Sequence, residues 1–507
     1  MIRTKILATM GPACSTADGI VALFEAGVDV CRLNFSHGNV QQHTAMLGQI
    51  REAAGRVGRQ IAVLGDLGGP KIRVGQVTDQ NGTGGMQISP GDDLVIQRKP
   101  IVGANGRISS TYEGLVDDVQ VGDRLMIEDG LLRFVCTEKS GDELRCRTTV
   151  GGVIKTGKGV NLPNTVVAVP SVTDRDWEYV EWAIDNELDY LALSFVRKAD
   201  DLKMVRFHLQ RRHSPIGLIA KIEKPEAVRE IDPILEVSDG LMVARGDLGV
   251  EMDVAQVPII QKDLITRCRD AGKPVIVATQ MLQSMVENAS PTRAEVSDVA
   301  NAIFDGTDAV MLSAETSVGK YPLGAVHTMN HVADVAENYL RGRQKNDMRA
   351  PRAADSAPAA ALARGAWRIT QDIGARAVVI WSQTGATALV FSKHHFPVPI
   401  VALSNNRRAL RKMAMYYGVQ PFEKAAPDDM ISIIAASDAL VQEKRLAVAG
   451  ERIIIVAGWS PAMPNTMNGI IVHTLGEKWA IVHPGTHHPG AVQSASQGAP
   501  QPAGVAR

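Results

Sequence analysis

Two neighbouring stretches, GLIAKIEKPEAV at 217–228 and SDGLMVARGDLGVEM at 238–252, decide the fold and locate the chemistry. Each stretch begins as a short apolar run and ends in charged residues. Apolar runs of this length, bounded by polar residues, are typical of buried parallel strands. In barrels and open α/β sheets, ligands bind at the carboxyl ends of parallel strands, so we expect these charges at the ligand end.

Three charged residues stand out at these strand ends. Lys221 and Glu223 are two positions apart, so a strand places both side chains on one face. Asp247 follows Glu223 by 24 residues, about one strand-helix-strand repeat, so we expect the two carboxylates at equal depth on adjacent strands. Two carboxylates beside an ammonium group fit a divalent-cation site with a positive charge left for an anionic substrate. A purely structural salt-bridge cluster is the alternative.

The composition limits the class of protein. At 507 residues the chain exceeds one ordinary core, and two to four domains are expected. The 54 Lys and Arg residues nearly balance the 55 Asp and Glu residues. The net charge therefore gives no reason to expect binding to nucleic acid or a membrane. The five scattered cysteines lack C-x-x-C spacing, which argues against a disulfide framework or zinc site. With neither a signal-peptide pattern nor the ~20 apolar residues of a membrane span, we expect a cytoplasmic protein.

A strand-helix repeat covers residues 1–70 and 170–345. Apolar, strand-like runs with helix-like segments between them occur at 5–11, 28–36, 61–73, 190–197, the two opening stretches, 274–281 and 308–316. Eight such repeats predict an α/β fold of the (β/α)8 TIM-barrel type.

Two further domains and a tail are expected around this barrel. Short alternating stretches at 71–169 predict a small β-barrel domain, inserted at the ligand end as a lid that excludes water, although a passive insertion remains the alternative. The sequence of residues 346–477 predicts a C-terminal α/β regulatory domain. Residues 478–507, rich in Pro, Gly, Ala and Ser, predict a disordered tail.

The last predicted domain contains a turn between a strand and a helix. This turn consists of Ser382, Thr384, Gly385 and Thr387 with their neighbours. Such a setting offers backbone amides and is typical of a phosphate-binding loop.

Motifs along the first two thirds of the chain occur together, and in this order, in one known family. They are CRLNFSHG (31–38), GPKIR (69–73), KGVNLP (158–163), LSFVRK (193–198), AKIEKPEAV (220–228), SDGLMVARGDLGVE (238–251), KPVIVATQML (273–282) and PTRAEVSDVANAIFDGTDAVMLSAET (291–316). Through these motifs the chain resembles the pyruvate kinase family over residues 2–330. The resemblance implies transfer of the phosphoryl group of phosphoenolpyruvate to ADP, giving pyruvate and ATP in the last step of glycolysis.

The resemblance implies roles for residues at the strand ends. Glu223 and Asp247 match the ligands of the divalent metal, Mg²⁺ or Mn²⁺. Lys221 matches the lysine that stabilises the transferring phosphoryl group and the enolate oxygen, a task that suits a compact point charge. Gly246 leads into a turn whose amides are expected to bind the substrate carboxylate.

Protonation of the enolate is assigned by the same resemblance. Thr279 matches the residue beside the carbon atom that accepts the proton, and Ser313 lies nearby in that pattern. Because a hydroxyl group is a poor acid, we expect a relay through water.

The resemblance further implies a set of nucleotide contacts. Arg32 and Arg73 match phosphate-binding arginines, whose planar forks can bind two oxygens at once. His37 resembles a residue lining the nucleotide site. Lys158 matches a lysine that reaches the phosphates when the lid closes, and Asp129 occupies a lid position facing the site.

The monovalent-cation pocket departs from the family pattern. The family builds it from Asn34, Ser36, Asp66 and the carbonyl of Leu67, and these residues are present. The glutamate that accompanies K⁺ dependence is replaced by Lys71. A lysine ammonium has the charge of K⁺ and nearly its bulk, so we expect Lys71 to reach into this pocket and make K⁺ unnecessary. A Lys71 side chain that points into solvent from the start of the lid linker is the alternative.

Regulation and assembly are also implied only by the resemblance. The sugar-bisphosphate loop of the family is basic where this chain has Gln383 and Ala386. We therefore expect a monophosphorylated effector, or none, at the 382–387 turn. The family suggests a homotetramer.

Two other classes of function compete with this interpretation. A metal-dependent aldolase or lyase acting on a pyruvate enolate could use the same carboxylates, but it has no need of the nucleotide-phosphate contacts expected of Lys158 and Arg73. A barrel retained as a binding or regulatory subunit is the non-enzymatic alternative. The presence together of Lys221, Glu223, Asp247 and Thr279 argues against it.

Overall fold

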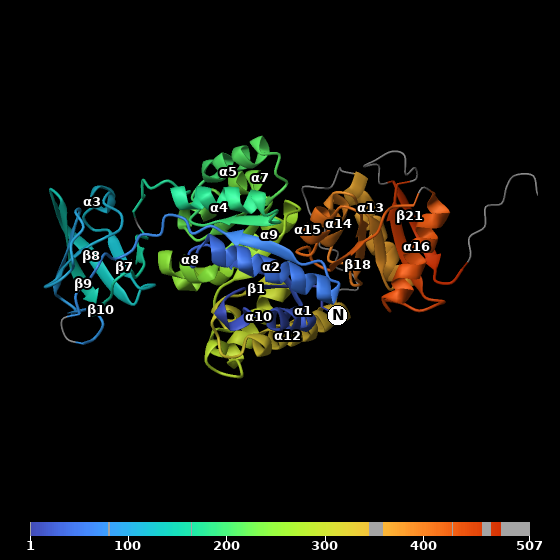
Figure 1. Cartoon of the computed structure of the whole chain (residues 1–507), viewed down its shortest axis with the longest axis horizontal. Coiled ribbons are helices and arrows are strands. Elements are labelled where there is room, and N and C mark those ends of the chain that lie inside the picture. Colours follow the sequence, from blue (N-terminus) through green and yellow to red (C-terminus); the bar gives the residue numbers. More distant parts are fainter. Residues whose placement is uncertain are drawn as a thin grey trace, which may run out of the picture.

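The computed structural model describes residues 2–79, 82–163, 165–343, 358–427, 429–458 and 468–477. Figure 1 shows a central barrel flanked at one end by a β domain and at the other by an α/β domain. The predicted tail at 478–507 and the stretch 344–357 lie outside the described residues.

Eight parallel strands form the closed central barrel, in the order β1-β16-β15-β14-β13-β12-β3-β2. They are β1 (Lys5–Thr9), β2 (Val28–Asn34), β3 (Ala62–Asp66), β12 (Tyr190–Leu193), β13 (Gly217–Ile222), β14 (Gly240–Ala244), β15 (Val275–Ala278) and β16 (Ala309–Leu312). Each strand falls within one of the apolar runs in the sequence, and the predicted TIM barrel is confirmed. These strands are buried on both faces, which explains why they are continuously apolar instead of alternating.

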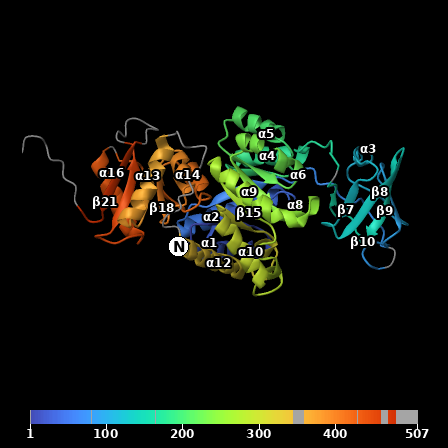
Figure 2. The ribbon, with the colours of Figure 1, turned by 180° about the vertical axis from the view of Figure 1, so that it is seen from behind.

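Helices cover the outside of the barrel, as Figures 1 and 2 show from opposite sides. They are α1 (Ala17–Ala26), α2 (Val40–Val57), α4 (Asp174–Asp185), α5 (Ala199–Arg211), α6 (Pro225–Arg229), α7 (Ile231–Val237), α8 (Arg245–Glu251), α9 (Val257–Asp270), α10 (Arg293–Asp305), α11 (Ala314–Ser317) and α12 (Pro322–Arg343), with 3-10 turns at Pro12–Cys14, Val254–Gln256 and Gln283–Val286. The capping box that begins α10, from Thr292 to Glu295, is formed as its spacing indicates.

The inserted segment forms separate sheets with a hydrophobic core of their own. A six-stranded sheet has the order β11-β7-β8-β9-β5-β6, and β10 pairs with β4. The elements are β4 (Met86–Ile88), β5 (Asp93–Gln97), β6 (Arg107–Ser109), α3 (Leu115–Asp118), β7 (Arg124–Ile127), β8 (Leu132–Ser140), β9 (Glu143–Val150), β10 (Gly152–Ile154) and β11 (Val160–Asn161). Because this core is separate from the barrel core, the segment is a structural unit of its own, joined to the barrel by two linkers. We call it the lid.

The C-terminal domain is an α/β sheet with the order β19-β18-β17-β20-β21, in which only the β20–β21 pair is antiparallel. Its elements are α13 (Pro358–Ile373), β17 (Val378–Trp381), α14 (Ala386–Ser392), β18 (Ile400–Ser404), α15 (Arg407–Met413), β19 (Val419–Glu423), α16 (Met430–Glu443), β20 (Arg452–Ala457) and β21 (Gly469–Thr474). Ala414 and Met415 of this domain pack into the apolar cluster inside the barrel. The domain therefore closes the end of the barrel opposite the lid (Figure 1).

No helix among the described residues is both long enough and apolar enough to cross a membrane.

Candidate active site

A polar layer lies on top of the apolar interior of the barrel. The interior cluster contains Val30, Leu64, Ala192 and Ile219, which belong to the neighbouring strands β2, β3, β12 and β13. Because side chains alternate along a strand, the residue two positions further on faces the same interior. These residues are Arg32, Asp66, Ser194 and Lys221. Strand geometry thus collects four polar side chains at the carboxyl-end mouth of the barrel.

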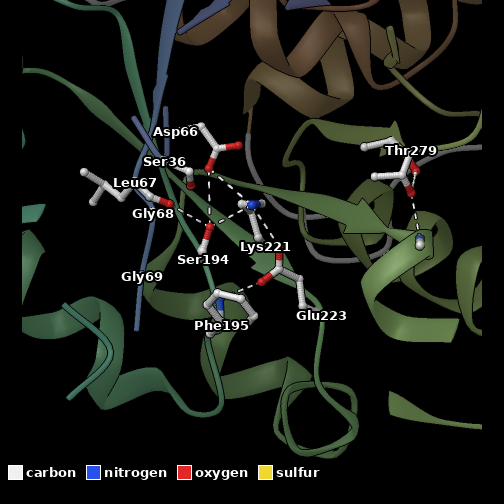
Figure 3. Close-up of polar contacts among 12 residues, drawn as sticks. Ser36, Asp66, Leu67, Gly68, Gly69, Ser194, Phe195, Lys221, Glu223 and Thr279 are labelled. Atoms are coloured by element: carbon white, nitrogen blue, oxygen red, sulfur yellow. Dashed lines mark hydrogen bonds and ion pairs between the residues drawn. The ribbon is translucent and has the colours of Figure 1, made fainter. Parts of the chain in front are cut away.

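Lys221 is the centre of this layer, as Figure 3 shows. Its ammonium lies 2.8 Å from Glu223 Oε1 and 3.3 Å from Asp66 Oδ1. It also donates to Ser194 Oγ at 2.7 Å. Lys221 is 9% exposed, and the two carboxylates are nearly fully buried. The cation is therefore held at a fixed point at the mouth.

Burial and neighbouring charges set the protonation states of this cluster. Burial by itself lowers the pKa of Lys221, but the carboxylates of Asp66 and Glu223 outweigh it, so that pKa is raised above its usual value. Burial raises the pKa of Asp66, but Lys221 and Arg32 outweigh it and the net pKa is lowered. The pKa of Glu223 is raised, chiefly by burial, against the opposing effect of Lys221.

Arg32 belongs to the same network. Its guanidinium is held by Asp66 Oδ2 at 2.7 Å and donates to Thr9 Oγ1 at 3.0 Å. This anchoring fixes the direction of the arginine fork at the strand end, which is the property that phosphate binding needs.

The two expected metal ligands are placed differently from the sequence prediction. Ile222 pairs with Val243, and β14 ends at Ala244, so Asp247 lies beyond the strand in the first turn of α8. Glu223 Oε2 accepts the N–H of Phe195 at 2.8 Å. The prediction of equal depth on adjacent strands was wrong, because the chain turns into α8 directly after Ala244.

The two carboxylates can hold a divalent ion only if other oxygen atoms complete its coordination shell. Among the described residues, no group of three or more His, Cys, Asp or Glu side chains could hold a metal alone. Mg²⁺ characteristically binds through one or two carboxylates, and water and substrate oxygens complete its shell. Glu223 and Asp247 supply such a pair.

Thr279 and Gly246 lie against each other on the other side of the mouth. Thr279 has φ +69°, which is unusual for a β-branched residue and marks stored strain. Its hydroxyl donates to the carbonyl of Ala278 at 2.6 Å and accepts the N–H of Gly246 at 2.7 Å. A Cβ atom at position 246 would lie only 3.2 Å from Thr279 Oγ1, so any larger residue there would crowd this hydroxyl. The Gly246 amide, expected to bind the substrate carboxylate, is directed at Thr279 here.

Ser313 begins α11 at the end of β16, and its N–H donates to Glu315 Oε2 at 2.7 Å. Arg245, which the sequence analysis did not single out, donates to the carbonyl of Thr279 at 2.9 Å and pairs with Asp298 at 2.7 Å. Arg245 thus holds the strained backbone of Thr279 in place.

A group of cations surrounds His37 beside this layer. The pKa of His37 is lowered by burial first, then by the positive charges of Arg73, Lys71, Arg32 and Arg175. Such a concentration of positive charge fits an anionic ligand with several phosphates.

The three predicted nucleotide-binding residues on or beside the lid have different surroundings. Arg73 is tied to the lid through the carbonyl of Gly157 at 3.0 Å, and Lys158 pairs with Glu128 at 2.6 Å. Asp129 instead lines a groove between the β7–β8 turn and the end of α8. Of the two adjacent acidic residues, Glu128 and not Asp129 therefore forms the ion pair with Lys158.

Two hydrogen bonds involve residues expected to build the monovalent-cation pocket. Asn34 Oδ1 accepts the N–H of Ser36 at 3.2 Å, and the carbonyl of Leu67 accepts the hydroxyl of Ser194 at 2.7 Å. Figure 3 places Ser36, Asp66 and Leu67 around one side of Lys221.

The structure corrects the position expected for Lys71. Among the described residues, no hydrogen bond or ion pair joins Lys71 to Asp66, Asn34 or Ser36. The side chain is exposed and lies near Gly159, where a Cβ atom would be 3.1 Å from its Cε. The reason is that Asp66 is already enclosed by Arg32 and Lys221.

The 382–387 turn has the predicted strand-turn-helix setting. Ser382 is buried after β17, and Gly385 has φ +83° and caps α14, which contains Thr387. Thr384 Oγ1 accepts the N–H of Ala386 at 3.4 Å.

Two contacts between the barrel and the lid linkers were missed. Glu251 Oε1 accepts from Lys224 at 2.7 Å and from Asn161 of β11 at 2.9 Å. Arg197 binds the outgoing linker through the carbonyls of Val167 and, at 2.7 Å, of Val169. Only the position of Lys224 and Arg197 next to the KIE and LSFV motifs hinted at this role.

The fold and the site together define a class of protein: a barrel phosphotransferase with a lid, in which a fixed lysine, a pair of carboxylates and a cluster of cations converge. Comparison with known proteins identifies the class more narrowly. The sequence profile of "Pyruvate kinase, barrel domain" matches residues 1–326, and that of "Pyruvate kinase, alpha/beta domain" matches residues 360–473.

Individual relatives agree with both profiles. The pyruvate kinase of Corynebacterium glutamicum is 39% identical over 479 residues, covering 94% of this chain and 99% of the relative. That of Geobacillus stearothermophilus is 41% identical over 485 residues, covering 94% and 81%. A crystal structure of a pyruvate kinase from Cryptosporidium parvum superposes with a TM-score of 0.86 at 33% identity, covering 94% and 96%. The chain belongs to the pyruvate kinase family.

Proposed function

We propose that the Lys221 cluster is the point at which this enzyme transfers the phosphoryl group of phosphoenolpyruvate to ADP, giving pyruvate and ATP. The observation that supports this most is the buried ammonium of Lys221, held between Asp66 and Glu223 at the barrel mouth. Phosphoryl transfer needs alignment and neutralisation of charge more than covalent catalysis. A preorganised cation in a site with little water meets that need.

Glu223 and Asp247 would hold a divalent ion, Mg²⁺ or Mn²⁺. When bound, this ion would neutralise phosphoryl and carboxylate oxygens of the substrate. The residues themselves position the reaction: Lys221 stabilises charge on the transferring group and the enolate oxygen, and Arg32 orients the phosphate. Anchoring by Asp66 and Ser194 keeps Lys221 from rearranging during the step.

Thr279 would serve the proton step at the methylene carbon, with Ser313 nearby. Its hydroxyl is occupied by Ala278 and Gly246 in the described state. We therefore propose that a water molecule ordered by Thr279 delivers the proton, as expected for a poor acid. Binding of the substrate carboxylate would compete with Thr279 for the Gly246 amide.

The cations around His37 would bind ADP. Arg73 and Lys158 sit on or beside the lid, so its closure would bring them toward the phosphates, while Asp129 at its groove would act only on lid position. The aldolase or lyase alternative has no support from the relatives, and it leaves this cation cluster without a ligand.

Regulation, assembly and location follow by analogy with the family. We propose a homotetramer in the cytoplasm that binds neither nucleic acid nor membrane. The 382–387 turn would accept a monophosphorylated effector, because it keeps hydroxyl groups and Gly385 but has Gln383 and Ala386 where a second phosphate would need basic residues. K⁺ would not be required.

A separation of the two chemical steps tests the site. Lys221→Met is expected to abolish pyruvate formation from phosphoenolpyruvate and ADP while exchange of pyruvate methyl protons with solvent continues. Thr279→Ala should impair the exchange. Glu223→Ala and Asp247→Ala should each remove most turnover at ordinary Mg²⁺ while circular dichroism stays unchanged. Equal loss of both activities in Lys221→Met would refute this division of roles.

A further inference from the structure

The lid carries two cysteines that its sheet places side by side. Cys136 in β8 and Cys146 in β9 are direct partners in the antiparallel register. They point to the same face, toward the lid core, and are 1% and 0% exposed. Their separation by 9 intervening residues gave no sign of this in the sequence, where all five cysteines are simply scattered.

The backbone hydrogen bonds show which kind of pair this is. The N–H of Cys136 donates to the carbonyl of Asp123 at 2.9 Å, and its carbonyl accepts the N–H of Gly122 at 2.8 Å. Both groups thus face the β7 side, since the N–H and C=O of one strand residue point the same way. Cys136 and Cys146 therefore form a non-hydrogen-bonded pair, in which Cα atoms approach to about 4.5 Å. Disulfides span Cα separations of about 4.4–6.8 Å.

The two thiols also interact with each other. A hydrogen bond from the thiol of Cys146 lowers the pKa of Cys136 to about 7, and the same bond raises the pKa of Cys146. By contrast, burial raises the pKa values of Cys14, Cys31 and Cys268. Because the thiolate is the reactive form, Cys136 is the more nucleophilic of the two thiols.

We propose that Cys136 and Cys146 are a redox modification site, at which a hydroperoxide converts the two thiols into a disulfide across β8 and β9. The Cys136 thiolate attacks one peroxide oxygen, giving a sulfenic acid and releasing water or an alcohol after proton uptake. The Cys146 sulfur then attacks the sulfenic sulfur and releases water. Overall the two thiols lose two protons and two electrons, and the electrons reduce the peroxide.

The disulfide would make part of the lid more rigid. A register shift lies directly after Cys136, so β8 and β9 are locally less regular there. The disulfide would pin them and stiffen β8, whose other neighbour is β7. Oxidation is therefore expected to slow amide hydrogen exchange across 132–150.

The test uses the full chain treated with hydrogen peroxide under native conditions, followed by alkylation in denaturant and mass spectrometry. The expected result is a loss of two hydrogens, a fall from five alkylated cysteines to three, and a tryptic product joining FVCTEK (134–139) to CR (146–147). Dithiothreitol should reverse all three changes.

Matched variants complete the test. Cys268→Ser should keep the linked peptide, whereas Cys146→Ala should lose it. Five alkylated cysteines after native treatment, or a link between any other pair, would overturn the proposal.

Discussion

Lys221 shows how the site fixes the charge of a single residue. Its pKa is raised because Asp66 and Glu223 more than offset burial. A raised lysine pKa stabilises the fold at all pH values below the usual pKa of about 10.5, and this contribution is lost as pH rises through the folded-state pKa. Within the physiological range Lys221 stays charged, so an alkaline limb in the rate profile must come from another group.

His37 should report nucleotide binding through its own protonation. Its pKa in the free enzyme is lowered by burial and by the four neighbouring cations, so it is largely neutral at pH 7. The phosphates of ADP would neutralise those cations, and the pKa of His37 should rise on binding, with uptake of a proton. Histidine-selective NMR titration with and without ADP measures this. His43 is the control, since its pKa is lowered mainly by burial and it should move little. An unchanged His37 titration would place the nucleotide elsewhere.

Lys71 bears on the requirement for K⁺, although it lies outside the pocket that was expected to hold it. Its charge adds to the cation group around His37, while Asp66 is neutralised by Arg32 and Lys221. We therefore expect full activity without K⁺, and Lys71→Glu, which replaces a cation by an anion beside the phosphates, should create K⁺ dependence. Steady-state rates in tetramethylammonium buffer with and without KCl decide it. Strong activation of the unchanged enzyme by K⁺ would contradict the expectation.

At the scale of elements, the sequence predicted the position of a side chain wherever that position depends on a single strand. Lys221 and Glu223 could be placed because apolar runs identify β13 and alternation orients its side chains. Asp247 was misplaced because the point at which β14 turns into α8 depends on packing, which spacing does not reveal. Lys71 was misplaced because its surroundings include a residue far away in the sequence, Gly159 of the lid. The pairing of Cys136 with Cys146 could not be predicted either, because it depends on the register between β8 and β9.

Glu251 illustrates how two elements are coupled. Nearly buried at the end of α8, it binds Lys224, next to metal-ligand candidate Glu223, and Asn161 of lid strand β11. Glu251→Gln should weaken this junction by about 1.5–3 kcal/mol, the range for a hydrogen bond to a charged group. Faster amide exchange at 158–163 and a raised KM for ADP, with kcat less affected, are expected. Glu226→Gln is a suitable control, because Glu226 lines the same cavity but, among the described residues, the bonds of Lys224 and Asn161 go to Glu251 instead. Equal effects of both changes would exclude a specific role for Glu251.

The whole molecule separates stability from chemistry along the barrel axis. The lid and the polar layer occupy one end, and the C-terminal domain closes the other with Ala414 and Met415 (Figure 1). This arrangement agrees with the general division of TIM barrels into a catalytic and a stabilising face. Contacts at the closed end should therefore affect folding more than turnover.

The ion pair between Lys393 and Asp308 allows a direct test of that division. It is 2.5 Å long and almost fully buried, and it joins the residue after α14 to the residue before β16. Lys393→Met leaves the carboxylate buried without its partner, which typically costs about 3–5 kcal/mol. The Tm of thermal unfolding should fall by several degrees, while kcat at saturating substrates stays near normal because Asp308 and Ser313 lie at opposite ends of β16. Adding Asp308→Asn should restore much of the loss, since the amide oxygen can still accept the N–H of Val275. Lys444→Met, which removes a surface pair with Glu443, should have almost no effect. A kcat that falls together with Tm in Lys393→Met would show that the closed end also controls the chemistry at the mouth.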